Sequence, residues 1–282
     1  MVDDARSAPA AADPAPALPA SPAKSWKESR LLSPAVLVLF LAAWEGAIHI
    51  LDVPAIVLPP PSAVAVALYE GFASGIFLYH LGVTLAEILA GFLIGALIGI
   101  VLGVAIGQSA FLERLFYPYV IAFQTIPKVA IAPIIVIWAG YGLSSKIIIT
   151  AAIAFFPVLA NTIVGLRSAP RDQIDMLKAC TATHWQVFRM VRLPHALPYV
   201  FVGLDVAIVL SVIGAIVGEF VGARSGLGYL ILQMNFSFDM AGVFAVLVIL
   251  SLIGIGLHAI MTVIQRRVLF WAESNDASLA AG

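Results

Sequence analysis

Long apolar stretches separated by short polar segments dominate the chain. A helix that crosses a bilayer needs about 20 mostly apolar residues. Six stretches reach or approach that length: 34–51, 79–107, 115–140, 147–166, 198–220 and 241–264. The pattern predicts an all-α integral membrane protein with six transmembrane helices, and an even number of spans places both termini on one side.

The two ends of the chain lack such stretches. Residues 1–30 are rich in Ala, Pro, Ser and charged residues, a composition that buries too little apolar surface to fold. We therefore expect a disordered tail over 1–33, one six-helix domain over 34–267, and a short C-terminal tail over 268–282. Between the first two spans, three prolines precede Ser62, which is predicted to cap a short helix at the outer surface.

Composition narrows the class further. AVILMFWYC residues make up 62% of the 282 residues and DEKR residues only 11%, whereas soluble chains carry about 25% charged residues. The net charge of −1 gives no basic face for nucleic acid. A single cysteine, Cys180, excludes an internal disulfide and zinc sites built from several cysteines, and no cofactor or metal motif is present.

Lys and Arg positions predict the orientation, because cytoplasmic loops are enriched in them. With the N-terminus inside, twelve of these residues are cytoplasmic. Only Lys146 and Arg224 fall outside, and Lys128 lies within a span. Both termini are therefore expected in the cytoplasm.

The second span contains five glycines at intervals of four: Gly91, Gly95, Gly99, Gly103 and Gly107. Such a stripe allows another helix to approach the backbone closely, so we interpret it as a packing surface. Glu87 extends the same ladder by one step and places an acid at that contact.

The third span is interrupted by Pro127 and Pro133, with Lys128 about halfway along. A charge at that depth should face protein or water, since it costs about 2.5–3.5 kcal/mol against lipid on insertion scales. Two interpretations stay open with equal weight. The broken helix lines a translocation path, or Lys128 is a structural ion pair, with Glu87 as one candidate partner.

Other polar residues in or near the spans have weaker signals. Glu45 and Asp205 are interpreted as structural hydrogen-bonding groups rather than functional ones. His49, His80 and His258 occur singly, without a metal-ligand spacing, which favours packing or interface roles.

The loop at 167–196, expected in the cytoplasm, is long for a connection between spans and too apolar to be a passive one. Pro170 suits the start of one short helix, and Thr183 is predicted to cap a second that runs to Val191 and is stopped by Pro194. Trp185, Phe188 and Val191 recur at spacing three, which indicates an amphipathic helix that packs on a partner or lies along the headgroups.

This loop resembles the cytoplasmic signature of the inner-membrane permease subunits of ATP-binding-cassette importers, in the nitrate, sulfonate, taurine and bicarbonate group. That signature reads Glu-Ala-Ala, three residues, Gly, nine residues, Ile, one residue, Leu-Pro. The matching positions here are Asp175, Met176, Leu177, Thr181, Val191, Leu193 and Pro194. The spacing fits without a gap, but Thr181 replaces a glycine, so the turn there is expected to differ.

The resemblance extends over roughly 35–265 and includes QTIPKVAIAP, AFFPVLANT, IVGEF and SGLGYLI, segments that are also similar to permeases for pyrimidine and riboflavin compounds. It implies a type I, methionine-importer-like fold and a homodimer with a cytoplasmic loop at 171–183 that docks on two ATPase subunits. It also implies an extracytoplasmic binding protein that delivers the substrate. Pro127, Lys128 and Glu87 become candidates to line the path.

The sequence contains no GxxxxGK[ST] loop, so the chain is not expected to hydrolyse ATP by that route. The substrate stays open between a small anion, such as a sulfonate, taurine or nitrate, and a vitamin precursor. The rival hypothesis is an ion-driven secondary transporter that uses Glu45, Glu87, Lys128 and Asp205 as relay groups.

Overall fold

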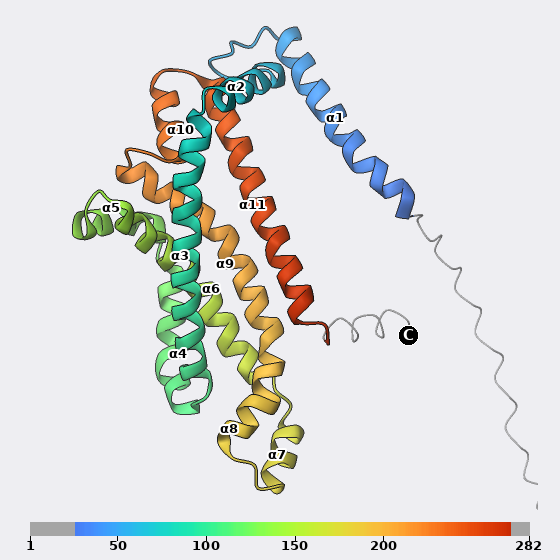
Figure 1. The fold of residues 1–282 in the computed structure, drawn as a ribbon, viewed down its shortest axis with the longest axis vertical. Helices are drawn as coiled ribbons and strands as arrows, with labels where there is room; N and C mark the ends of the chain where they lie inside the picture. Colours follow the sequence, from blue (N-terminus) through green and yellow to red (C-terminus); the bar gives the residue numbers. More distant parts are fainter. Residues whose placement is uncertain (1–25, 272–282) are drawn as a thin grey trace, which may run out of the picture.

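The protein is seen in a computed structural model that describes residues 26–271, with side chains from Pro34 onward, and the described part consists of helices joined by loops (Figure 1). Residues 1–25 of the predicted disordered tail 1–33, and residues 272–282 of the predicted C-terminal tail, lie outside the described residues. The helices are α1 (Trp26–Ile50), α2 (Pro61–Ala73), α3 (Ile76–Gly107), α4 (Ala110–Thr125), α5 (Lys128–Ala139), α6 (Leu143–Arg167), α7 (Arg171–Ala179), α8 (His184–Val187), the π-helical turn η1 (Phe188–Arg192), α9 (Leu193–Gly222), α10 (Leu227–Phe236) and α11 (Met240–Val268). Helix α1 thus begins within the segment assigned to the tail.

The helices long enough to cross a membrane match the predicted spans. Within residues 26–271, four qualify: α3, α6, α11 and the continuous helix His184–Gly222. Helices α4 and α5 qualify only as a pair bent by 93°, and the apolar part of α1, Pro34–Ile50, is shorter. The all-α membrane architecture is confirmed, whereas the count of six spans stays a prediction.

Helix α6 lies at the centre of the bundle, between α3 and α9 (Figure 1). The five glycines of α3 all face α6. A Cβ atom built on any of them would lie 2.4 to 2.9 Å from an atom of α6, closer than side chains tolerate. Glycine at these positions therefore allows the two helix backbones to touch.

Helix α9 approaches the other side of α6 in the same way. A Cβ on Gly203 would lie 3.0 Å from the carbonyl oxygen of Pro157, and one on Gly214 would lie 2.9 Å from the Cα of Thr150. Small residues on two neighbours thus enclose α6, and its side chains Ile149, Val158 and Ile163 are almost fully buried.

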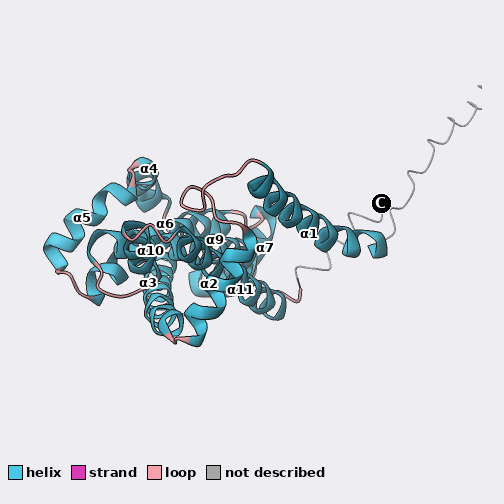
Figure 2. Ribbon diagram, turned by 90° about the horizontal axis from the view of Figure 1, so that it is seen from above, coloured by secondary structure: helices cyan, strands magenta, loops and turns pink. Residues whose placement is uncertain are grey.

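Shorter helices cover the two ends of this bundle. Helices α2 and α10 lie at one end, and α7 and α8 at the opposite end (Figure 1). Helix α1 stands apart on one side and α5 projects on the other, as the view from above also shows (Figure 2). Helix α1 is connected to the bundle through α2 and through Trp44, whose ring centre is 5.9 Å from that of Phe244 on α11.

The predicted start of α2 is wrong in one detail. The N-cap residue is Pro60, and Ser62 already lies inside the helix. Its backbone N–H and its hydroxyl donate to the carboxylate of Glu45, at 3.0 and 2.7 Å. Because the first N–H groups of a helix lack internal partners, a carboxylate from α1 takes over the role predicted for Ser62.

The predicted stop at Pro194 is also wrong, because the helix continues to Gly222. A proline ring in a regular α-helix collides with the carbonyl four residues earlier, here that of Met190. The π turn relieves this collision: Leu193 donates its N–H to the carbonyl of Phe188, one residue further back than in an α-helix.

We predict that Gly95→Ala destabilises the protein by about 1–3 kcal/mol, because the new methyl group would lie 2.5 Å from the carbonyl oxygen of Ala151. Thermal unfolding of the purified protein in detergent measures this. Gly82→Ala on the same helix is the matched control, since nothing lies within 4 Å of its added methyl. Equal melting temperatures for the two variants would contradict the assigned packing.

Candidate functional site

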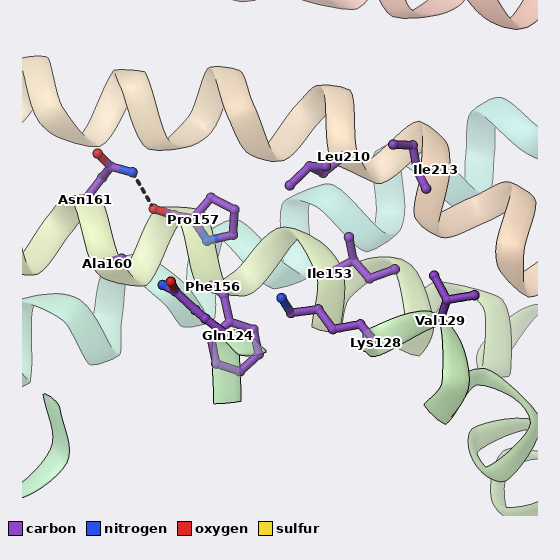
Figure 3. A pocket seen from close by; sticks show the side chains of 10 residues that line it. All are labelled: Gln124, Lys128, Val129, Ile153, Phe156, Pro157, Ala160, Asn161, Leu210 and Ile213. Carbon is purple, nitrogen blue, oxygen red and sulfur yellow. Dashed lines mark hydrogen bonds between the residues drawn. The ribbon is translucent and has the colours of Figure 1, made fainter. Parts of the chain in front are cut away.

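A cavity of about 550 Å³ lies between the bent pair α4–α5 and the central helices α6 and α9 (Figure 3). Its lining residues are Gln124, Lys128, Val129, Ile153, Phe156, Pro157, Ala160, Asn161, Leu210 and Ile213. Its wall is mostly apolar, with a few polar groups that converge on it, the pattern typical of small-molecule sites.

The break between α4 and α5 positions Lys128 at this cavity. Pro127 lacks an N–H and precedes the first residue of α5, while Ile126 has an extended backbone (ψ 128°). Irregular backbone at membrane depth is tolerated only where it faces protein or a water-filled cavity. The predicted broken helix is therefore confirmed, and its first residue after the break is the lysine.

The cavity offers three kinds of interaction. The ammonium of Lys128 lies 5.0 Å from the ring centre of Phe156, within cation–π range. Asn161 donates its side-chain N–H to the carbonyl of Pro157 at 2.8 Å, which leaves its amide oxygen as an acceptor (Figure 3). Gln124 adds a second amide. A bound molecule would thus meet a cation, an aromatic ring and two amides.

Glu87 does not line this cavity, and its predicted pairing with Lys128 is wrong. Its side chain is fully buried, and its carboxylate accepts a hydrogen bond from Lys146 on α6 at 3.0 Å. Lys146 was expected in an outer loop, but it lies in α6 with 5% of its surface exposed. The close approach of α3 and α6 brings the two charges together inside the protein.

A second buried carboxylate, Glu219 of α9, completes this cluster. It accepts a hydrogen bond from the hydroxyl of Thr84 at 2.6 Å and another from the backbone N–H of Gly228. The Thr84 hydroxyl in turn accepts the N–H of Leu227 at 2.7 Å. Two side chains therefore satisfy the N–H groups at the start of α10.

The turn before α10 requires glycine for this arrangement. Gly226 has φ +115°, a conformation that side chains disfavour, and a Cβ there would lie 2.1 Å from the Glu219 carboxylate. Its N–H donates to Nδ1 of His80 at 2.9 Å. The IVGEF and SGLG segments are thus two halves of one contact.

The remaining polar candidates each have a separate partner. Glu45 binds Ser62 on α2 and lies 3.5 Å from His49, and Asp205 on α9 lies 2.6 Å from Nδ1 of His258 on α11. The four proposed relay groups are therefore engaged at four different places. Among the side chains described between Pro34 and Trp271, no group of three His, Cys, Asp or Glu residues could hold a metal ion.

The predicted signature loop forms α7, a turn, and the start of the long helix. Asp175 and Met176 are exposed on α7, with 61% of Met176 accessible, and Leu177 is half-buried. After α7, Thr181 donates its N–H to the carbonyl of Lys178 at 2.9 Å and Ala182 donates to that of Leu177 at 3.0 Å. These are the two bonds of a Schellman turn.

Thr181 keeps the left-handed conformation that glycine normally supplies, with φ +61°. The expectation of a different turn is wrong: the shape is the ordinary one, held despite the steric cost to a β-branched residue. Thr183 caps the next helix as predicted, because its hydroxyl accepts the N–H of Gln186 at 3.3 Å and Gln186 accepts the Thr183 N–H at 2.7 Å.

The apolar face predicted for the second short helix packs inward. Phe188 and Val191 are buried, and the exposed ring of Trp185 stacks on Phe188 at 5.4 Å. Leu193 and Pro194 lie half-buried in the first turn of α9.

Sequence reasoning did not single out several residues that prove central: Gln124, Phe156, Asn161, Lys146 and Glu219. The first three lie in the QTIP and AFFPVLANT segments. Gln124 is four residues from Lys128, whereas Phe156 and Asn161 come from another helix and carried no local signal. The pairing of Lys146 with Glu87 carried no local signal, since 59 residues separate them.

Comparisons with known proteins agree on one kind of protein. The family described as "Binding-protein-dependent transport system inner membrane component" matches residues 95–270. The riboflavin transport system permease protein of Chloroflexus aurantiacus is 41% identical, over 86% of this chain and 90% of its own. The formylaminopyrimidine transport permease protein of Halalkalibacterium halodurans is 37% identical, over 86% of this chain and 97% of its own.

A solved structure shares the fold. A chain of the MetNI methionine ABC transporter, in inward facing conformations, superposes with a TM-score of 0.59 at 25% identity. The match covers 67% of this chain and 94% of the other, so the architecture of that chain is nearly all present here.

We predict that Lys146→Met destabilises the protein by about 3–5 kcal/mol, because it leaves buried carboxylate without a counter-charge. The double variant Lys146→Met with Glu87→Leu should lose less stability than the single variant, since both charges of the pair are removed. Thermal unfolding in detergent measures all three proteins.

Lys178→Met is the control, because Lys178 forms an exposed ion pair with Asp175 at 3.3 Å, which contributes at most about 1 kcal/mol. If Lys146→Met and Lys178→Met have the same melting temperature, the buried pair does not stabilise the bundle.

Proposed function

The chain belongs to the family of binding-protein-dependent transport system inner membrane components, and on that premise we propose how its parts carry out transport. It is a multi-pass permease subunit of an ATP-binding-cassette importer. The observation that carries the proposal is the cavity beside the broken helix α4–α5, which joins a cation, an aromatic ring and two amides at membrane depth.

We assign the translocation path to this cavity. Pro127 forms the break between α4 and α5, and Lys128 forms the charged part of the cavity wall. Glu87 is assigned a structural role with Lys146. Gln124, Val129 and Ile213 remain exposed, so one chain bounds the cavity on one side only. A second copy of the chain, related by two-fold symmetry, would close it, which supports a homodimer.

The energy for transport would come from separate subunits. The sequence has no GxxxxGK[ST] loop, and the distribution of Lys and Arg supports a cytoplasmic position for the loop 167–196 and for both termini. We propose that two ATPase subunits dock on 171–183, mainly through Asp175 and Met176 of α7, and that 171–194 transmits their movement to α9. The membrane is then the bacterial inner membrane, with a binding protein on the opposite face.

A small nitrogen heteroaromatic compound is the substrate class that we favour. The two relatives are named for riboflavin and formylaminopyrimidine transport. The Phe156 ring could stack on such a molecule, and the amides of Gln124 and Asn161 could pair with its polar edge. Lys128 supports a second candidate, a small anion such as a sulfonate, taurine or nitrate. The ion-driven alternative gains no support from these relatives.

The first test is uptake by liposomes that contain the permease with its ATPase and binding protein. We expect ATP-dependent uptake and none without ATPase. Phe156→Leu should lower uptake of a heteroaromatic substrate roughly threefold to tenfold, because stacking is lost. Phe220→Leu, on a more exposed phenylalanine outside the cavity, should leave uptake unchanged.

Competition among riboflavin, formylaminopyrimidine and taurine identifies the substrate class. Taurine uptake that depends on Lys128 but not on Phe156 would replace the heteroaromatic assignment by the anionic one. Uptake against a gradient by the permease alone would contradict the proposal as a whole.

Met176→Glu tests the docking assignment. It should reduce co-purification of the ATPase at least about tenfold while the melting temperature stays constant, because a charge replaces an exposed apolar contact. Met190→Glu is the matched control, since Met190 is equally exposed at 64% but lies outside 171–183. Equal losses in both variants would argue against α7 as the docking element.

A further inference from the structure

A second cavity, of about 640 Å³, lies where α3 ends and α4 begins, next to the end of α6 and to α7. Its character differs from that of the path, because charged residues dominate its lining. The lining residues are Gly107, Gln108, Glu113, Arg114, Leu166, Arg167, Ala169, Arg171, Ile174, Asp175, Lys178 and Arg192. Five of them are basic and two are acidic.

Both acids of this pocket are already paired. Glu113 forms an ion pair with Arg167, and Asp175 forms one with Lys178 at 3.3 Å. Three guanidinium groups are left, those of Arg114, Arg171 and Arg192, which have no ion-pair partner among the side chains that the structure describes from Pro34 onward. The lining of the pocket therefore has a net formal charge of about +3.

One of these arginines is held in an unfavourable state. The Nε–H of Arg192 is buried and has no hydrogen-bond acceptor within the described part of the chain. A buried donor without an acceptor destabilises the folded state, and more so when the group is charged. Arg192 lies on the π turn, Arg114 on α4 and Arg171 at the start of α7, so three separate elements direct this charge into one space.

We propose that this pocket binds a phosphate group. Guanidinium groups bind phosphate through paired hydrogen bonds in a matching planar geometry, and a phosphate has enough oxygens to accept from all three. Gly107 and Leu166 add apolar lining at the point where the apolar helices end, which suits the apolar part of an anionic phospholipid next to its phosphate. A soluble phosphate compound has the same chemistry and is the other source.

This inference does not require the proposed transport function; the proposed orientation only assigns the lipid to the cytoplasmic leaflet. Its test uses the purified full-length permease in detergent, without ATPase or substrate. Failure here leaves the uptake experiment unaffected, and failure of uptake leaves phosphate binding intact.

Two measurements distinguish the sources. Native mass spectrometry compares retention of phosphatidylglycerol with that of phosphatidylcholine with the same acyl chains. Thermal unfolding compares inorganic phosphate with chloride at equal ionic strength. Both are applied to the wild type, to Arg114→Gln/Arg192→Gln, and to Arg114→Lys/Arg192→Lys.

We expect selective retention of phosphatidylglycerol by the wild type and an about tenfold loss in the Gln double variant. The Lys double variant, which keeps the positive charge, should retain part of the phosphatidylglycerol binding. Arg189→Gln is the control, since Arg189 is exposed on the same turn but does not line the pocket.

Stabilisation by inorganic phosphate that the Gln double variant abolishes, without lipid preference, would assign the pocket to a soluble phosphate compound. Absence of both effects overturns the proposal.

Discussion

The contact of α6 with two glycine-bearing helices is the constraint on which the rest of the fold depends. Lipid offers no hydrophobic force that drives apolar helices together, so their association relies on close packing of backbones. Five glycines of α3 and further glycines of α9 allow that approach on opposite sides of α6. Any side chain at these positions would separate the helices and disconnect the polar groups between them.

The buried cluster is a consequence of that packing. Glu87, Lys146 and Glu219 come from α3, α6 and α9, and each is at most 5% exposed. Charges in such an environment are tolerated only when they are paired and hydrogen-bonded. Glu219 also accepts the N–H of Gly228, and Thr84, which donates to Glu219, accepts the N–H of Leu227. These bonds join the three central helices to the turn before α10.

The apolar pattern predicted the helices well because membrane-spanning segments have a strong and local signal. It predicted the break at Pro127 and the capping residue Thr183 for the same reason: both depend on neighbours a few residues away. The place of Lys146 could not be predicted, because the charge rule counts residues in loops and cannot detect a partner 59 residues away.

Two other differences have local causes that a sequence pattern hides. Ser62 is not the N-cap because a carboxylate from another helix replaces it, and Pro194 does not end a helix because a π turn accommodates its ring. Of the candidate path residues, Lys128 could be expected from its charge, whereas Phe156 and Asn161 looked like ordinary helix residues until the bend in α4–α5 brought them to one cavity.

The unbroken helix His184–Gly222 has a mechanical consequence. At about 1.5 Å per residue its 39 residues make a rod roughly 60 Å long, with the Trp185 ring near one tip and Glu219 near the other. A tilt of about 5° around its midpoint would displace each tip by about 2.6 Å in opposite directions. This displacement would strain the hydrogen bonds around Gly226 at the other end of the helix, on the far side of the membrane. It would not do so if the π turn bent and absorbed the movement.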